Sequence, residues 1–143
     1  MTQNDYHIPV LRDACIDGLN IKTAGIYVDV TFGGGGHSQA ILEKLGPKGK
    51  LIGFDQDKDA IQNTIDDERF QLISDNFKYL KRFLKFYGYS KVDGILADFG
   101  VSSHQFNFPE RGFSLRYNAD LDMRMDQSQL LTAKQVINKY PED

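Results

Sequence analysis

Four consecutive glycines, at positions 33–36, lie between a short apolar run and a segment with helical periodicity. The run 26–30 is β-branched and aromatic and predicts a buried strand, while 37–45 predicts a helix that stops at Gly46-Pro47. Glycines let the backbone pass close to a ligand, and the N–H groups that open the helix carry partial positive charge. The pattern favours a loop that holds a phosphate or a carboxylate, and a flexible turn without a ligand is the alternative.

The rest of the chain alternates in the same way. Segments 50–54, 70–73 and 92–97 predict strands, and segments 57–66, 77–87 and 129–139 predict helices. This alternation is typical of parallel strands joined by right-handed crossovers, hence of a doubly wound α/β sheet. Residues 99–128 predict a long loop, of the kind that is functional or disordered. Because open sheets of this class commonly have more than about four strands, we expect residues 1–143 to form one incomplete part of a domain.

Composition narrows the class of protein. The 143 residues are 41% hydrophobic and 26% charged with a net charge of −3, which predicts a globular domain without general attraction to nucleic acid. Cys15 is the single cysteine, so a disulfide framework is excluded and a reducing, cytoplasmic location is expected. The three histidines are not clustered, and we expect no metal site. The sequence predicts neither a membrane span nor a signal peptide.

The spacing of the glycines does not fit a dinucleotide-binding loop. A dinucleotide fingerprint that starts at Gly33 or Gly34 would end at Ser38 or Gln39, neither of which is glycine, so an NAD-dependent enzyme is disfavoured.

Acidic residues follow the predicted strands. Asp55 lies about 20 residues beyond the glycines, where an acid accepts hydrogen bonds from both hydroxyls of a ribose. Both hydroxyls are free in an adenosyl ligand such as S-adenosylmethionine.

Two later strand ends carry further candidates. Phe77 is placed either to stack on adenine or to pack on the apolar face of its own helix, and both readings stay open. Asp75 is placed either to accept from the adenine amine or to cap that helix. Asp98 is suited to hold an exocyclic amine in line for transfer, and a role as a turn residue before Gly100 is the alternative.

Several blocks carry a resemblance to a known family. DVTFGGGGHS, FDQD, DGILADFGVSSHQ, RGFS and LDMRMD resemble the bacterial 16S ribosomal RNA cytidine N4-methyltransferases, and 7–10 with Asp13 is similar to the opening HxPVLxxE segment of that family. The resemblance implies a Rossmann-like class I methyltransferase fold and S-adenosylmethionine as cofactor. It also implies methylation of a cytidine N4 in the small ribosomal subunit.

The resemblance also assigns residues. The cofactor contacts of the family fall on Gly35, Gly36, His37, Asp55, Phe77, Asp98 and Gln105. We also expect Asp98 to be the catalytic residue, which orients the amine or accepts its proton. The family often has proline where this chain has His104. Its members are longer, with a helical insertion and further strands, so the resemblance supports a cofactor-binding part with little activity alone.

Cys15 lies outside every block, so a cysteine nucleophile is not indicated, and we expect a single in-line displacement without a covalent intermediate. The loop around Ser102, Ser103 and Gln105 is expected to close over the methyl group. The alternatives are a methyltransferase that acts on another acceptor and a non-catalytic nucleotide-binding module. Basic residues are consistent with an RNA partner, although a charge run such as that in segment 77–87 is more often a solvated helix face. These residues are Lys78, Lys81, Arg82, Lys85, Arg111, Arg116 and Arg124.

Overall fold

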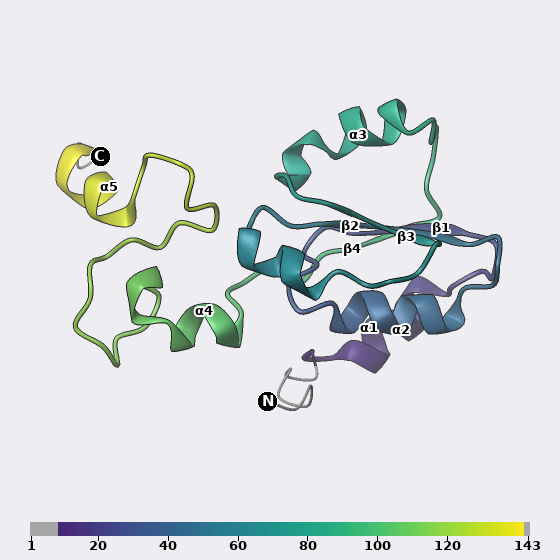
Figure 1. Ribbon diagram of the computed structural model, residues 1–143, viewed down its shortest axis with the longest axis horizontal. Coiled ribbons are helices and arrows are strands. Elements are labelled where there is room, and N and C mark those ends of the chain that lie inside the picture. The colour runs from purple at the N-terminus through teal and green to yellow at the C-terminus, as the bar shows by residue number, and fades with distance from the viewer. Residues whose placement is uncertain (1–8, 142–143) are drawn as a thin grey trace. The chain divides into compact units, whose positions relative to one another are not determined.

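The computed structural model describes residues 9–141 (Figure 1). The chain divides into two compact units, one that ends at Phe99 and one that begins at Gly100. Each unit is described by itself below. That the two units belong to one domain remains a prediction.

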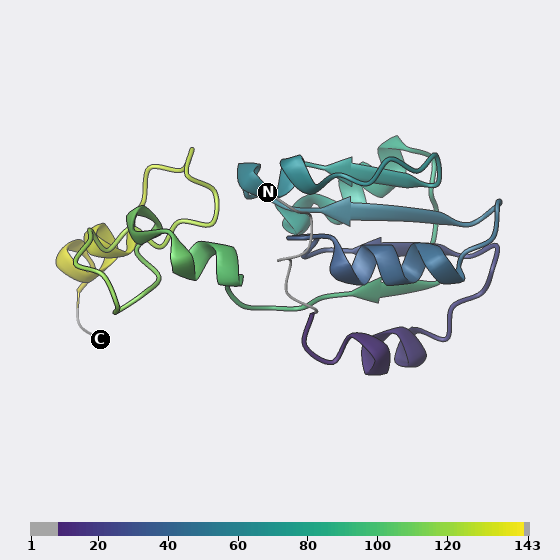
Figure 2. The ribbon, with the colours of Figure 1, turned by 60° about the horizontal axis from the view of Figure 1, so that its bottom comes forward.

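The first unit contains a four-stranded parallel sheet. Its strands are β1 (Ile26–Asp29), β2 (Lys50–Phe54), β3 (Phe70–Ile73) and β4 (Gly94–Leu96), in the order β3-β2-β1-β4. Figure 2 shows the arrows running in one direction. The pairing places Asp29 beside Gly53 on one side and beside Leu96 on the other. The doubly wound α/β fold predicted from the sequence is confirmed, with strand bounds close to those expected.

Helices cover both faces of this sheet. Helices α1 (Arg12–Leu19) and α2 (Gly36–Lys44) lie on one face, and α3 (Leu80–Phe86) lies on the other (Figure 1). Because successive side chains of a strand point to opposite faces, β1 contributes to both apolar clusters. Tyr27 packs with α2, whereas Val28 packs beneath α3.

The strand order determines where a ligand site is expected. The chain winds from β1 to β2 to β3 and then returns to the other side of β1 to form β4. The winding direction therefore reverses between β1 and β4. In open α/β sheets, ligands bind at the carboxyl ends of the strands beside such a reversal.

Two helical predictions for the first unit need correction, and one helix of this unit was not predicted. Segment 57–66 forms a short 3₁₀ helix, η1 (Lys58–Asn63), in which Ala60 is buried and Ile61 is exposed. Segment 77–87 begins as a 3₁₀ turn, η2 (Phe77–Tyr79), before α3. Helix α1 was not predicted, because its eight residues bury only Ile16 and give little helical periodicity.

The second unit contains more helix than expected from a long loop. Helix α4 (Ser103–Asn107) and the 3₁₀ turn η3 (Pro109–Arg111) lie within the predicted loop 99–128. Helix α5 (Ala133–Lys139) starts four residues later than predicted, because Thr132 caps it. Within residues 9–141, no helix combines the length and the apolar character that a membrane crossing requires.

Two sequence blocks in the second unit bind each other. Arg111 donates from Nη2 to the carbonyls of Arg124 and Met125, at 3.2 and 3.3 Å, and its own carbonyl accepts from the N–H of Met123 at 3.0 Å. Gly112 has a φ of +70°, and a Cβ there would come within 2.5 Å of the Asp120 carbonyl oxygen. The RGFS and LDMRMD blocks are therefore joined by hydrogen bonds to main-chain atoms.

Candidate functional site

The glycine loop after β1 is held at its start by Asp29. This carboxylate is fully buried and accepts from Ser38 Oγ at 2.8 Å and from the Thr31 N–H at 3.1 Å. Burial raises the pKa of Asp29, because the charged form loses hydration that these donors only partly replace. Asp29 thus joins the end of β1 to the first turn of α2.

Asp55 and Asn63 hold the other side of the loop. Asp55 Oδ2 accepts from the Gly33 N–H at 2.8 Å, and Asn63 Nδ2 donates to the Gly33 carbonyl at 3.0 Å. The second Asp55 oxygen accepts from the Asp57 N–H at 2.9 Å. Burial raises the pKa of Asp55 as well. The acid predicted to bind a ribose therefore also fixes the loop that precedes α2.

The loop requires glycine for two different reasons. Gly33 and Gly35 have φ values of +52° and +78°, a region that L side chains rarely adopt. At Gly35 a Cβ would also lie 3.1 Å from the Phe32 ring, while at Gly36 it would lie 2.5 Å from Pro9. Around Gly33 the nearest atom to such a Cβ is 3.9 Å away, so this part of the loop is open.

His37 lies at the start of α2 and faces Asp98 at the end of β4. Its Nε2 is 3.5 Å from Asp98 Oδ2, and the imidazole is buried with only 5% of the residue exposed. Neither ring nitrogen has a hydrogen-bond partner among residues 9–141. An unpaired buried polar group costs about 1–3 kcal/mol, so this imidazole is suited to a partner that binds from outside.

Asp98 is positioned through its main chain. Its N–H donates to Thr31 Oγ1 at 2.8 Å, which joins the end of β4 to the glycine loop. The carboxylate itself is 55% exposed. The structure therefore brings Asp98 together with His37 and the loop, beside the winding reversal between β1 and β4.

Phe77 lies at the same end of the sheet, after β3. It is 39% exposed and its ring centroid lies 5.9 Å from that of Phe99, which is also exposed. The core beneath α3 contains Leu80, Phe83 and Leu84. The reading in which Phe77 packs into this core is therefore wrong, and its ring is available for stacking.

The helix cap after β3 also differs from expectation. Asn76 is the residue that caps, because its Oδ1 accepts from the Lys78 N–H at 2.9 Å. Its Nδ2 donates to Gln56 Oε1 at 2.7 Å, which joins the segments that follow β2 and β3. Asp75 accepts from the Asn76 N–H at 2.6 Å and does not cap the helix.

Gln105 belongs to the second unit. Its Oε1 accepts from the Ser102 N–H at 3.0 Å in a capping box at the start of α4, and its Nε2 donates to Met125 Sδ at 3.3 Å. The side chain is buried. Its assignment to a cofactor contact remains a prediction, and a local structural role is now evident.

Two arginines considered for RNA binding have structural roles within the second unit. Arg111 is buried, and Arg124 pairs with Asp122 through two short bonds of 2.6 and 2.8 Å. Arg124 also donates to the carbonyls of Gln127 and Gln129. Arg116 and the basic residues of η2 and α3 are exposed. These four are Lys78, Lys81, Arg82 and Lys85.

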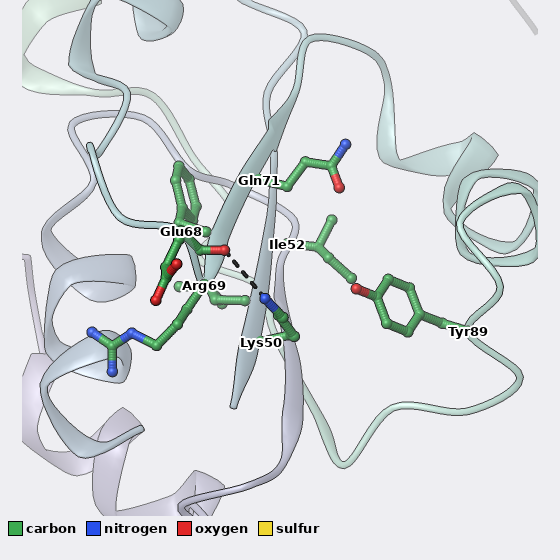
Figure 3. Close-up of a pocket in the computed structure, with 8 residues that line it drawn as sticks. Lys50, Ile52, Glu68, Arg69, Gln71 and Tyr89 are labelled. Atoms are coloured by element: carbon green, nitrogen blue, oxygen red, sulfur yellow. Dashed lines mark hydrogen bonds between the residues drawn. The ribbon is translucent and has the colours of Figure 1, made fainter. Parts of the chain in front are cut away.

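A hollow in the first unit lies away from these residues. Figure 3 shows it at the start of β2 and β3, with Lys50, Gln71 and Tyr89 on its wall. Its volume is about 230 Å³. Lys50 Nζ donates across it to the Glu68 carbonyl. Because it lies at the amino ends of the strands, this hollow is not the predicted cofactor site. In the described part of the chain, no three metal-binding side chains are gathered in a way that would hold an ion.

Comparisons with known proteins agree with this geometry. The sequence matches the MraW methylase family over residues 4–143. A protein named ribosomal RNA small subunit methyltransferase H from Christiangramia forsetii is 66% identical over 139 residues, which is 97% of this chain and 46% of that protein. The Flavobacterium johnsoniae protein of the same name is 62% identical over 141 residues, 99% of this chain and 47% of that protein. The chain spans about half the length of the curated relatives it matches.

Among solved structures, a Clostridium thermocellum protein named provisionally as an rRNA methylase is 24% identical. It superposes with a TM-score of 0.47 over 55% of this chain and 49% of that one. This likeness is too weak to support an argument by itself.

The parallel sheet, with the glycine loop and the acids at the ends of its strands, defines a Rossmann-like α/β protein. The sequence match then makes the assignment specific. The chain belongs to the MraW methylase family. The opening segment of the earlier resemblance lies partly outside the described residues, since His7 and Ile8 are not among them.

Proposed function

We propose that this chain contributes the cofactor-binding part of a cytoplasmic enzyme that uses S-adenosylmethionine to methylate a cytidine N4 of 16S ribosomal RNA. The observation that carries the proposal is the group formed by the glycine loop, Asp55, His37 and Asp98 at one end of the sheet. The names of the relatives, which are ribosomal RNA small subunit methyltransferases, support the substrate.

The residues present fit an adenosyl cofactor. Gly33 leaves open space beside the loop, and the two His37 nitrogens lack partners among the described residues. Asp55 uses its oxygens for the Gly33 and Asp57 N–H groups, but a carboxylate has about four acceptor positions and retains capacity for ribose hydroxyls. Phe77 offers an exposed ring for adenine.

Asp98 is the residue proposed to act on the amine. When bound, the cofactor supplies an electrophilic methyl group: the N–C bond forms as the C–S bond breaks, sulfur keeps the electron pair, and the amine nitrogen loses a proton. Asp98 orients the N–H of the amine and accepts that proton, since its carboxylate is exposed while its backbone is fixed by Thr31.

An RNA partner is supported by the exposed basic residues of η2 and α3. Lys81 and Lys85 lie on the solvent side of α3, away from the core residues Phe83 and Leu84. Phosphate contacts of this kind release counterions and depend strongly on salt. We therefore expect Lys81→Gln/Lys85→Gln to weaken RNA binding and lower its salt dependence. Lys44→Gln/Lys48→Gln removes the same charge on the α2 side and should leave both unchanged.

Calorimetric titration tests the proposal directly. We expect the chain to bind S-adenosylmethionine and S-adenosylhomocysteine and to bind NAD far more weakly. Mass spectrometry of small-subunit RNA treated with the intact protein should then show N4-methylcytidine. Binding without any methylated product would indicate a nucleotide-binding module, and a different methylated nucleoside would indicate another acceptor. Preference for NAD would overturn the cofactor assignment.

Asp55→Asn tests the acid that is proposed to bind the ribose and that also holds the Gly33 N–H. Loss of a charged acceptor should weaken cofactor binding by about 1–3 kcal/mol, measured by calorimetry. Asp66→Asn changes an exposed carboxylate in the segment before β3 and is the control. Equal affinities for both variants would contradict the ribose role of Asp55.

A further inference from the structure

His37 and Asp98 form a pair that joins the interior of the first unit to its surface. The imidazole is buried, whereas more than half of the Asp98 side chain is exposed. The two side chains approach within 3.5 Å through Nε2 and Oδ2. Asp98 therefore contacts a buried imidazole while it remains open to solvent.

The imidazole lacks the partners that a buried polar ring requires. Both ring nitrogens are without a hydrogen bond to any residue from 9 to 141. Buried polar atoms in this state are rare and each needs an explanation. Shortening the separation from Asp98 by about half an ångström would produce a hydrogen bond at Nε2.

The backbone of Asp98 is already fixed, but its side chain is not. The Asp98 N–H donates to Thr31 Oγ1, and the Thr31 N–H in turn donates to the buried Asp29. These bonds set where the Asp98 Cα lies. The direction of the carboxylate still depends on a contact of its own, and Nε2 of His37 is the neighbouring donor.

We propose that His37 is a positioning residue that acts through Asp98. Its Nε2–H donates to Oδ2 and holds the carboxylate toward the incoming amine. The proposal rests on the methyl transfer proposed above, in which the N–C bond forms, the C–S bond breaks and the amine loses a proton. That proton goes to Asp98, where an O–H bond forms as the N–H bond breaks, and then to solvent. The imidazole keeps its own proton throughout.

The first test needs neither cofactor nor activity. Nitrogen-15 NMR of the imidazole in the unliganded protein should show a proton on Nε2, the nitrogen that faces Asp98. Asp98→Ala removes the acceptor and should shift the Nε2 resonance of His37. A spectrum of His37 that Asp98→Ala leaves unchanged would overturn the proposal.

The second test uses the kinetics of the intact protein. His37→Leu should lower kcat by up to about a hundredfold, because a misplaced group loses its alignment with the amine. KM for RNA should stay within about threefold, so that the loss falls on kcat. His37→Gln retains an amide donor near the place of Nε2 and should recover most of the rate. Urea unfolding of His37→Leu checks that the variant remains folded, so that a lower kcat reports the lost donor.

Coupling between the two residues completes the test. In an Asp98→Ala background, His37→Leu should have no further effect on kcat, whereas two independent losses would overturn the proposal. A weaker cofactor affinity with unchanged kcat would also overturn it and would make His37 a cofactor contact only. If the unsubstituted protein does not methylate RNA, the proposed function fails, while the NMR result still reports on the pair.

Discussion

The two compact units of the chain are stabilised in different ways. All of the buried apolar residues in the described part of the chain lie in the first unit, around the sheet. From residue 100 to 141 the buried residues are Gln105 and Arg111, both polar. Large apolar side chains there, such as Leu115 and Leu130, are exposed. The second unit is held by helix caps and by bonds from arginines to carbonyls.

This contrast shows which functional assignments each unit can support. In the first unit the core fixes the strands, so that polar groups such as His37 and Asp98 are free to serve a ligand. In the second unit the polar groups themselves maintain the structure. Arg111 and Arg124 are therefore poor candidates for RNA contacts, although both lie in blocks that resemble a methyltransferase family.

The largest expected effect is at Gly112. Gly112→Val places a side chain against the backbone of Asp120 and Asp122 at a φ of +70°. We expect a loss of about 3 kcal/mol or more in the stability of the second unit, because backbone atoms cannot move aside cheaply. Hydrogen exchange should show fast exchange at Met123 and Ala133 with β1 and β2 still protected. Equal loss of protection in both units would show that they do not unfold separately.

A smaller effect is expected in the first unit from Gly35→Val. The φ of +78° and the Phe32 ring both oppose a side chain there, at a cost of about 2 kcal/mol. Urea unfolding followed by NMR should show the loss, together with weaker cofactor binding. Gly18→Ala is the control, since open space surrounds that position. Full cofactor affinity in Gly35→Val would show that the loop conformation does not determine binding.

Arg111→Met compares the two kinds of stabilisation directly. It removes the donor to two carbonyls and should cost the second unit about 1–3 kcal/mol. Arg116→Met, at an exposed site, should stay within about 0.5 kcal/mol. Unfolding monitored by NMR signals of residues 121–125 measures both. A higher stability of Arg111→Met would contradict this expectation and would show that apolar burial, rather than hydrogen bonding, limits the stability of this unit.

The smallest effect is a difference in pH dependence. The Arg124 guanidinium lowers the pKa of Asp122, so its contribution is present above the unfolded value of 3.8 and is lost as pH falls through the folded pKa. Burial raises the pKa of Asp29, so its contribution is present below 3.8 and is lost as pH rises through the folded pKa.

These opposite signs give a paired test. At pH 5, Asp122→Asn should lower the free energy of unfolding by less than about 1 kcal/mol. This loss should become smaller as the pH falls to 3. The stability lost by Asp29→Asn should grow over the same range. Urea unfolding at several pH values, read separately for each unit, measures both trends. The same sign for both variants would contradict the assigned causes.

Much of the first unit was predictable from its sequence. The strands were found because buried parallel strands leave uninterrupted apolar runs, such as that around Val28 and that around Ile52. The acids at Asp55 and Asp98 were found because they follow those runs directly. The 3₁₀ conformation of the short helix after β2 was not predicted, because the helical spacing of apolar residues does not distinguish a 3₁₀ helix from an α-helix.

The second unit was poorly predicted, although its sequence contains usable signals. The spacing Ser102-x-x-Gln105 marks the start of α4, and Thr132-x-x-Gln135 marks the start of α5. The burial of Arg111 left no trace in the pattern, because long-range bonds from a side chain to carbonyls have no periodicity. The absence of hydrogen-bond partners for the His37 ring nitrogens within the described residues likewise depends on tertiary structure alone.

The bonds that fasten Gly33 and Ser38 have a thermodynamic consequence for any molecule that binds beside them. The main chain there loses its freedom when the protein folds, so little ordering entropy remains to oppose association. Differences in affinity among a series of adenosyl analogues would then reflect the atoms of each analogue rather than rearrangement of the protein.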